Sequence, residues 1–167
     1  MQVYTGDGKG KTTAALGLSL RAAGAGLKVF IGQFVKSQYY SELKTLMKLY
    51  PDITVKQYGR SCFIYRQPSD EDIQAARKGF IEIEKIVLSG EYELVVLDEA
   101  NIAMYYNLVP VEDFIRLIDN KPQHVELVFT GRRAPQDIID RADLVTVMQE
   151  IKHYYSKGVE AREGIEK

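Results

Sequence analysis

The chain contains no tryptophan and a single cysteine, Cys62, among its 167 residues. One cysteine excludes an internal disulfide, so a reducing compartment such as the cytoplasm is the simplest location to expect. The sequence also lacks an apolar run long enough to span a bilayer and the pattern of an N-terminal signal peptide. Its 22 basic and 23 acidic residues leave a net charge of −1, without the basic excess that is typical of nucleic-acid-binding domains. We therefore expect neither a membrane nor a nucleic acid as a partner.

The length and composition fit one globular domain over residues 1–167. Apolar residues make up 46% of the chain, which is enough for a sizeable core. Short β-branched runs alternate along the chain with longer segments of helical period. Strands are expected at 3–5, 28–34, 53–58, 94–97, 125–130 and 144–148, and helices at 12–25, 41–49, 69–88, 110–118 and 135–141. This alternation predicts an α/β fold with a mostly parallel central sheet and helices on both faces.

A glycine-rich loop lies between the first expected strand and the first expected helix. Its backbone N–H groups can face one anion, and the helix N-terminus adds a favourable dipole. Lys11 can place a charge on distal phosphates, and the Thr12 hydroxyl can bind Mg²⁺. Three residues separate Gly6 from Gly10, where the common motif has four. The loop predicts an ATP site in a P-loop (RecA-like) fold, with a simple glycine turn as the alternative. The expected ATP-binding residues are Gly6, Asp7, Gly8, Lys9, Gly10, Lys11, Thr12 and Thr13.

Two more polar motifs follow expected strands, and in a parallel sheet such strand ends meet at one edge. Asp98 and Glu99 come directly after an apolar run, and such a pair can hold Mg²⁺ together with Thr12. The alternative is a polar strand end with a helix-capping Asp. Arg132 follows a later strand, and its guanidinium suits a phosphate, although a solvated turn is equally favoured there. The polar segment 151–167 is expected to close near this site.

Together these motifs resemble the P-loop type of ATP:corrinoid adenosyltransferase. The resemblance covers nearly the whole chain. It implies transfer of the 5′-deoxyadenosyl group of ATP to the Co(I) of a reduced corrinoid, such as cob(I)alamin or cob(I)yrinic acid a,c-diamide, with release of triphosphate and with Mg²⁺ or Mn²⁺ as cofactor. The markers are the segments 5–15, 33–36, 95–99, 130–132, 142–145, 152–153, 158–159 and 164–165.

The resemblance also implies roles for single residues. Lys11, Arg132 and a metal ion held by Thr12 and Glu99 would stabilise the leaving triphosphate. Phe63 and Tyr65 correspond to an aromatic pair that packs against the lower face of the corrin, with Tyr65 in place of the family's tryptophan. A homodimer and a reduced flavoprotein as electron donor are further expectations. The alternative is a P-loop ATPase or kinase that cleaves the γ-phosphate.

Overall fold

The computed structural model describes residues 1–36, 41–59 and 67–166. Its centre is one six-stranded sheet in the order β3-β2-β4-β5-β1-β6, and every pairing in it is parallel. The predicted α/β fold with a parallel sheet is therefore confirmed. The strands are β1 (Gln2–Thr5), β2 (Val29–Phe34), β3 (Ile53–Tyr58), β4 (Leu94–Asp98), β5 (Glu126–Thr130) and β6 (Leu144–Val147).

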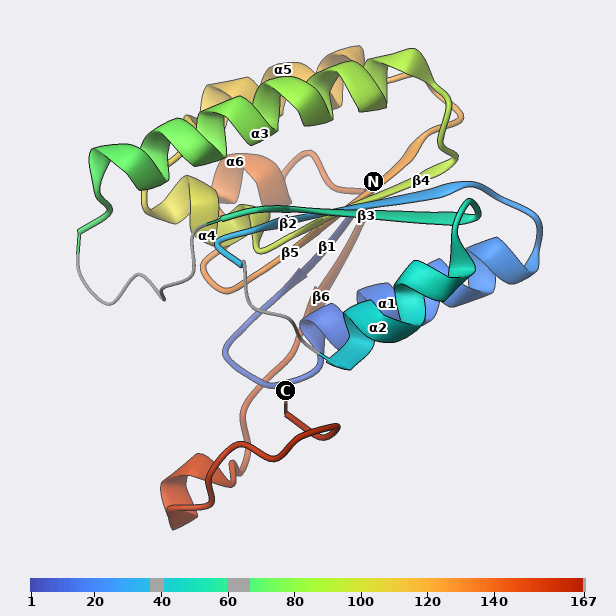
Figure 1. Ribbon diagram of the computed structural model, residues 1–167. Helices are drawn as coiled ribbons and strands as arrows, with labels where there is room; N and C mark the ends of the chain where they lie inside the picture. The colour runs from blue at the N-terminus through green and yellow to red at the C-terminus, as the bar shows by residue number, and fades with distance from the viewer. Residues whose placement is uncertain (37–40, 60–66, 167) are drawn as a thin grey trace.

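Helices cover both faces of the sheet, as Figure 1 shows, with α3 and α5 above it and α1 and α2 below it. On the upper face, Phe80, Phe114 and Ile138 join α3, α5 and α6 to the sheet in one apolar cluster. On the lower face, Ala15 of α1 and Leu46 of α2 pack in a second cluster. The helices are α1 (Lys11–Gly24), α2 (Ser41–Leu46), α3 (Asp70–Ser89), α4 (Ala100–Tyr105), α5 (Val111–Asn120) and α6 (Gln136–Ile139).

Local sequence explains where these elements begin and end. β2 and β4 are buried along their whole length, as strands covered on both faces should be. α3 begins with a capping box, in which the side chains of Ser69 and Asp72 each accept from the other's backbone N–H. The helix ends at Gly90, which adopts a left-handed conformation with φ of 67°.

The main departure from the prediction lies directly after β4. Glu99 adopts the left-handed conformation, and α4 begins at the next residue. The sequence did not predict this helix, because six residues are too few to show a helical period. The helix expected over 41–49 is α-helical only to Leu46 and continues as a 3₁₀ turn. Pro135 stands just before α6 instead of within its first turn.

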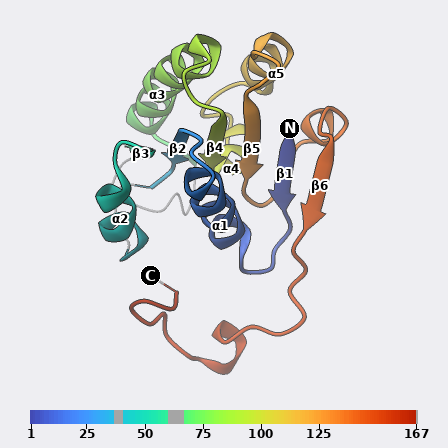
Figure 2. The same cartoon turned by 90° about the vertical axis from the view of Figure 1, so that its right-hand side faces the viewer.

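After β6 the chain forms a C-terminal tail, residues 148–166, with one 3₁₀ turn at Tyr155–Lys157. Figure 2 shows this tail passing below the sheet from the β6 edge toward the side where α2 lies. Within it, the Arg162 guanidinium lies 4.7 Å from the centre of the Tyr154 ring and pairs with Glu166 at 2.8 Å. No helix in the described ranges has the length and apolar character needed to cross a membrane.

Candidate functional site

The phosphate loop, residues 6–13, follows β1 and includes the first turn of α1. Gly6 and Gly10 have φ of 94° and 117°, values that favour glycine. The buried Lys11 ammonium lies inside the curve of the loop and donates to Gly6 O at 2.7 Å and Gly8 O at 2.6 Å. Burial, and then the nearby Arg132, lower the pKa of Lys11. The two carbonyls hold the ammonium at the place where an anion would sit in the loop.

The glycines of this loop are also needed because the start of the tail passes close to them. The Gly8 N–H donates to Met148 O at 2.7 Å, and the Met148 N–H donates to Thr5 O at 2.8 Å. A Cβ on Gly8 would lie 2.7 Å from Met148 O, and one on Gly6 would lie 2.5 Å from the same atom. A side chain at either position would therefore push residue 148 away from the loop.

Asp98, at the end of β4, is the centre of a hydrogen-bond network, and only 1% of its surface is exposed. Its Oδ1 accepts from the hydroxyls of Thr12 at 2.8 Å and Thr130 at 2.5 Å. Its Oδ2 accepts from Gln33 Nε2 at 3.1 Å and Lys36 Nζ at 2.7 Å. Burial alone would raise the pKa of Asp98, but the Lys36 ammonium and the hydrogen bonds outweigh burial and lower it. These contacts favour the ionised form of the Asp98 carboxylate, and each of its oxygens accepts two hydrogen bonds.

The strand order explains why these groups meet. β4 lies between β2 and β5, and Gln33 is directly opposite Asp98 in the β2–β4 register. Thr130 ends β5, the strand between β4 and β1, so it lies between Asp98 and the phosphate loop. The expected meeting of three strand ends at one edge of the sheet is confirmed by the contacts of Thr12 and Thr130 with Asp98.

Glu99 differs from its neighbour in every respect that matters for metal binding. Its backbone N–H donates to Thr130 Oγ1 at 3.1 Å, whereas its carboxylate has no hydrogen-bond partner within the described part of the chain. Burial, and then the Asp98 carboxylate, raise the pKa of Glu99. A Cβ on Gly131 would lie 3.2 Å from Glu99 Oε2, so the glycine leaves room for this carboxylate. A partly buried carboxylate without a partner fits a cation-binding role.

A Mg²⁺ ion that is bound mainly by substrate phosphates needs only one or two protein ligands. The Thr12 hydroxyl oxygen and the Glu99 carboxylate fit that requirement. Asp98, expected from the sequence to be a third ligand, has both oxygens engaged by four donors. The described residues contain no group of three His, Cys, Asp or Glu side chains that could hold a metal without substrate.

The two arginines after β5 point to different neighbours. Arg132 Nε lies 3.9 Å from Asp7 Oδ1 of the phosphate loop, and both side chains are exposed. Arg133 adopts φ of 57° and lies over the Tyr105 ring, 4.2 Å from its centre. Of the two, Arg132 is therefore the one beside the phosphate loop. The side chains of Asp7, Lys9 and Thr13 are exposed, and Phe63 and Tyr65 lie outside the described residues.

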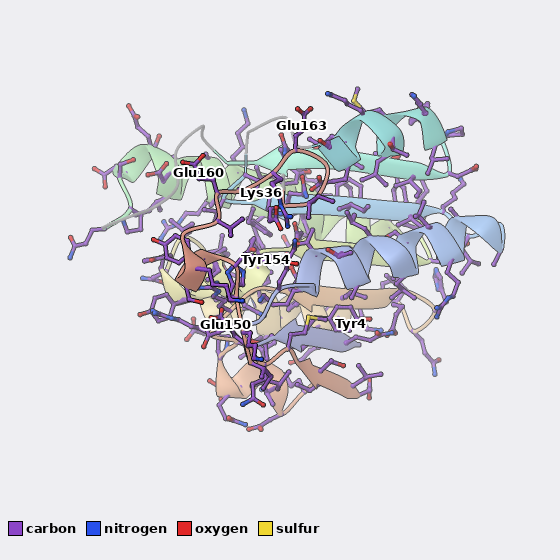
Figure 3. The ribbon with its side chains drawn as sticks, turned by 90° about the horizontal axis from the view of Figure 1, so that it is seen from below. Tyr4, Lys36, Glu150, Tyr154, Glu160 and Glu163 are labelled. Carbon is purple, nitrogen blue, oxygen red and sulfur yellow. The ribbon has the colours of Figure 1, made fainter. Side chains whose placement is uncertain are left out.

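The far end of the tail also returns to the phosphate loop. Lys9 Nζ donates to Ile165 O at 2.9 Å and to Glu166 Oε1 at 3.3 Å. In Figure 3, which looks at the molecule from below, the tail crosses the view from Glu150 past Tyr154 to Glu163. The two ends of the tail are thus hydrogen-bonded to consecutive residues, Gly8 and Lys9. Sequence reasoning named Thr130, Gln33 and Lys36 only as family markers, because a strand order was needed to place them beside Asp98.

The chain is similar to known proteins along nearly its whole length. The family model described as ATP:corrinoid adenosyltransferase BtuR/CobO/CobP matches residues 1–166. The corrinoid adenosyltransferase of Escherichia coli (strain K12) is 32% identical over 165 residues, which cover 98% of this chain and 83% of that protein. The corrinoid adenosyltransferase CobA of Salmonella typhimurium is 34% identical over 165 residues, with the same coverage. A corrinoid adenosyltransferase of Sinorhizobium sp is 32% identical over 174 residues, covering 98% of this chain and 78% of that protein.

Proposed function

The chain belongs to the ATP:corrinoid adenosyltransferase family, and we propose that it carries out this reaction where the phosphate loop, Glu99 and Arg132 meet at the carboxyl edge of the sheet. The observation that carries the proposal is the arrangement of the loop, with the buried Lys11 ammonium in its curve and the Thr12 hydroxyl bonded to Asp98. The ATP:corrinoid chemistry needs such a place for a triphosphate, because the whole triphosphate is the leaving group.

The reaction moves the 5′-deoxyadenosyl group from ATP to a reduced corrinoid. Co(I) supplies the electron pair for the new bond from cobalt to C5′, the bond from C5′ to oxygen breaks, and triphosphate leaves with the two electrons of that broken bond. Since cobalt is itself the nucleophile, no side chain has to attack. The protein must hold the two reactants in line and stabilise the charge that develops on the leaving oxygen.

In our proposal Lys11 and Arg132 provide that stabilisation, together with the N–H groups of the phosphate loop. When ATP enters, Lys11 exchanges the carbonyls of Gly6 and Gly8 for phosphate oxygens. Mg²⁺ or Mn²⁺ bound to Thr12 and Glu99 would supply a further positive charge on the triphosphate. Asp98, whose oxygens already accept from four donors, would act on such a metal through Thr12.

The C-terminal tail closes the nucleotide site in this proposal. The support is that its start bonds to Gly8 and its end bonds to Lys9, so both ends of the tail lie against the phosphate loop. Closure would exclude water from the reacting centre. On the corrinoid side, Phe63 and Tyr65 would pack against the lower face of the corrin. A reduced flavoprotein as electron donor and a homodimer complete the proposal.

Product analysis under anoxic conditions tests it. The purified protein is mixed with ATP, Mg²⁺ and chemically reduced cob(I)alamin, and the Co(I) absorbance band and the phosphate products are followed together. We expect loss of Co(I), a light-sensitive adenosylated corrinoid and one triphosphate per turnover. Accumulation of ADP and phosphate without consumption of corrinoid would instead show a P-loop ATPase or kinase.

A further inference from the structure

Lys36 is a largely buried cation at the carboxyl edge to which the reaction as described assigns no part. Only 16% of its side chain is exposed, and its ammonium forms an ion pair with the fully buried Asp98 at 2.7 Å. Burial would lower the pKa of Lys36, but Asp98 outweighs this effect and raises it. Figure 3 shows Lys36 in the middle of the edge that the tail crosses. Removing the two charges of this pair from water costs free energy, which their mutual attraction repays only when the geometry is good.

The backbone around Lys36 is built to bring it to this place. The preceding residue, Val35, has φ of 57°, a left-handed conformation that is a genuine outlier for a β-branched residue. A Cβ on Gly59 would lie 2.5 Å from the Lys36 nitrogen and 2.8 Å from the Val35 carbonyl carbon. Gly59, which follows β3, therefore leaves room for the strained backbone of Val35 and Lys36, which follows β2. Such strain persists only where the surrounding structure fixes it, and it occurs most often at functional sites.

The contacts of Asp98 show what Lys36 can do from there. With Oδ2 held on the β2 side by Lys36 and Gln33, the carboxylate plane is fixed and Oδ1 faces Thr12. The single hydroxyl proton of Thr12 is then used in the bond to Oδ1. Its oxygen lone pairs are left for a metal ion bound in the phosphate loop. Groups that orient a metal ligand in this way commonly change metal affinity by 10- to 100-fold when they are removed.

We propose that Lys36 is a positioning residue of the nucleotide site, which acts through Asp98 to orient the Thr12 hydroxyl toward the metal of the metal–ATP complex. This inference rests on the proposed function, since it takes Thr12 as a metal ligand. Lys36 also contributes charge, because the metal–ATP complex carries a net negative charge and Asp98 alone would repel it. Both effects predict weaker binding of the complex when Lys36 is replaced by a neutral residue.

The test is a double-mutant cycle with Mn²⁺·ATP as the probe and no corrinoid present, so that binding is measured apart from turnover. Bound Mn²⁺ is followed by the loss of the free-ion signal in electron paramagnetic resonance. We expect Lys36→Met to weaken Mn²⁺·ATP binding at least about tenfold. In a Thr12→Val background the same change should weaken binding less than about threefold, because residues that act through one another are not additive. Lys36→Arg should remain within about threefold of the unaltered protein.

Lys56→Met is the matched control, since Lys56 also ends in an ion pair with a carboxylate, that of Glu82, but on the exposed surface of β3. It should leave binding unchanged. If Lys36→Met does not fold, as judged by circular dichroism, Lys36→Gln takes its place with the same expectations.

Equal effects of the Lys36 change in both backgrounds, or no effect, would overturn the inference while leaving the metal site intact. If Thr12→Val itself left Mn²⁺·ATP binding unchanged, the metal site of the proposed function would fail, and the inference about Lys36 with it. Weakening by Thr12→Val together with a non-additive Lys36 effect supports both.

Discussion

Replacing Thr130 by valine removes two hydrogen bonds from the centre of the site with almost no change of shape. The Thr130 hydroxyl donates to Asp98 Oδ1 at 2.5 Å and accepts from the Glu99 N–H at 3.1 Å. Loss of a hydrogen bond to a charged group costs about 1.5–3 kcal/mol, and an unpaired buried N–H costs about 1–3 kcal/mol. The lower part of the second range applies, because the Glu99 N–H is only partly buried. The added methyl group recovers about 0.8 kcal/mol. We therefore expect the free energy of unfolding to fall by about 2–4 kcal/mol.

Calorimetry and urea unfolding both measure this decrease. In a domain of this size each kcal/mol changes the melting temperature by about 2–4 °C, so the expected fall is about 4–16 °C. Thr146→Val is the control, because Thr146 is exposed on the edge strand β6, where such a change alters stability by less than about 0.5 kcal/mol. A Thr130→Val variant as stable as this control would refute the reasoning, since the Asp98 network would then contribute nothing to the folded state.

Three further predictions concern the phosphate loop and the tail. Lys11→Ala should lower kcat about 10²- to 10³-fold with the circular dichroism spectrum unchanged, and unaltered steady-state kinetics would reject the phosphate role of Lys11. Gly8→Ala should speed tryptic cleavage after Lys152, because the new Cβ would lie 2.7 Å from Met148 O and displace the start of the tail. Gly17→Ala is the control, since a Cβ there meets nothing within 4 Å. Equal rates of cleavage in the two variants would contradict the contact between Gly8 and Met148. Arg162 lowers the pKa of Glu166 to about 2. Because a lowered carboxyl pKa stabilises the folded state above the ordinary pKa and the effect is lost only as pH falls through the lowered value, the Arg162 amide resonance should stay constant from pH 8 to about pH 4 and shift near pH 2. A midpoint near the ordinary glutamate pKa of about 4.3 would show that the pair does not form.

The sequence predicted most of the fold because its signals are local. The buried strand β4 appears as an uninterrupted apolar run, and the capping box at Ser69 and the glycine at position 90 mark both ends of α3. The phosphate loop was recognisable because its glycines, Lys11 and Thr12 lie next to one another in the chain. In each case the residues that decide the structure are only a few positions apart.

The network around Asp98 could not be predicted in the same way, because it depends on which strands are neighbours. Gln33 and Lys36 reach Asp98 only since β2 lies beside β4, and Thr130 only since β5 lies on the other side. The spacing of residues along the chain does not predict the order of the strands in the sheet. For the same reason, the sequence could not show that both oxygens of Asp98, one of the three expected metal ligands, accept hydrogen bonds from neighbouring strands and from the phosphate loop. The position of the tail beside the phosphate loop likewise depends on backbone contacts such as that of Gly8 with Met148.

Asp98 and Glu99 show how position can separate the properties of two adjacent carboxylates. Asp98 is fully buried and Glu99 partly buried, and burial by itself raises the pKa of a carboxyl group. Asp98 ends the strand and accepts from donors on both sides, so its pKa is lowered in spite of complete burial. At Glu99 the left-handed backbone turns the chain out of the sheet, so the Glu99 carboxylate does not share the donors of Asp98. The pKa of Glu99 is raised. A positively charged ligand therefore gains more from Glu99 than from Asp98, because only Glu99 is short of a partner. The strained turn at Glu99 is what makes the difference, and the Thr130 hydroxyl that accepts its N–H holds that turn in place.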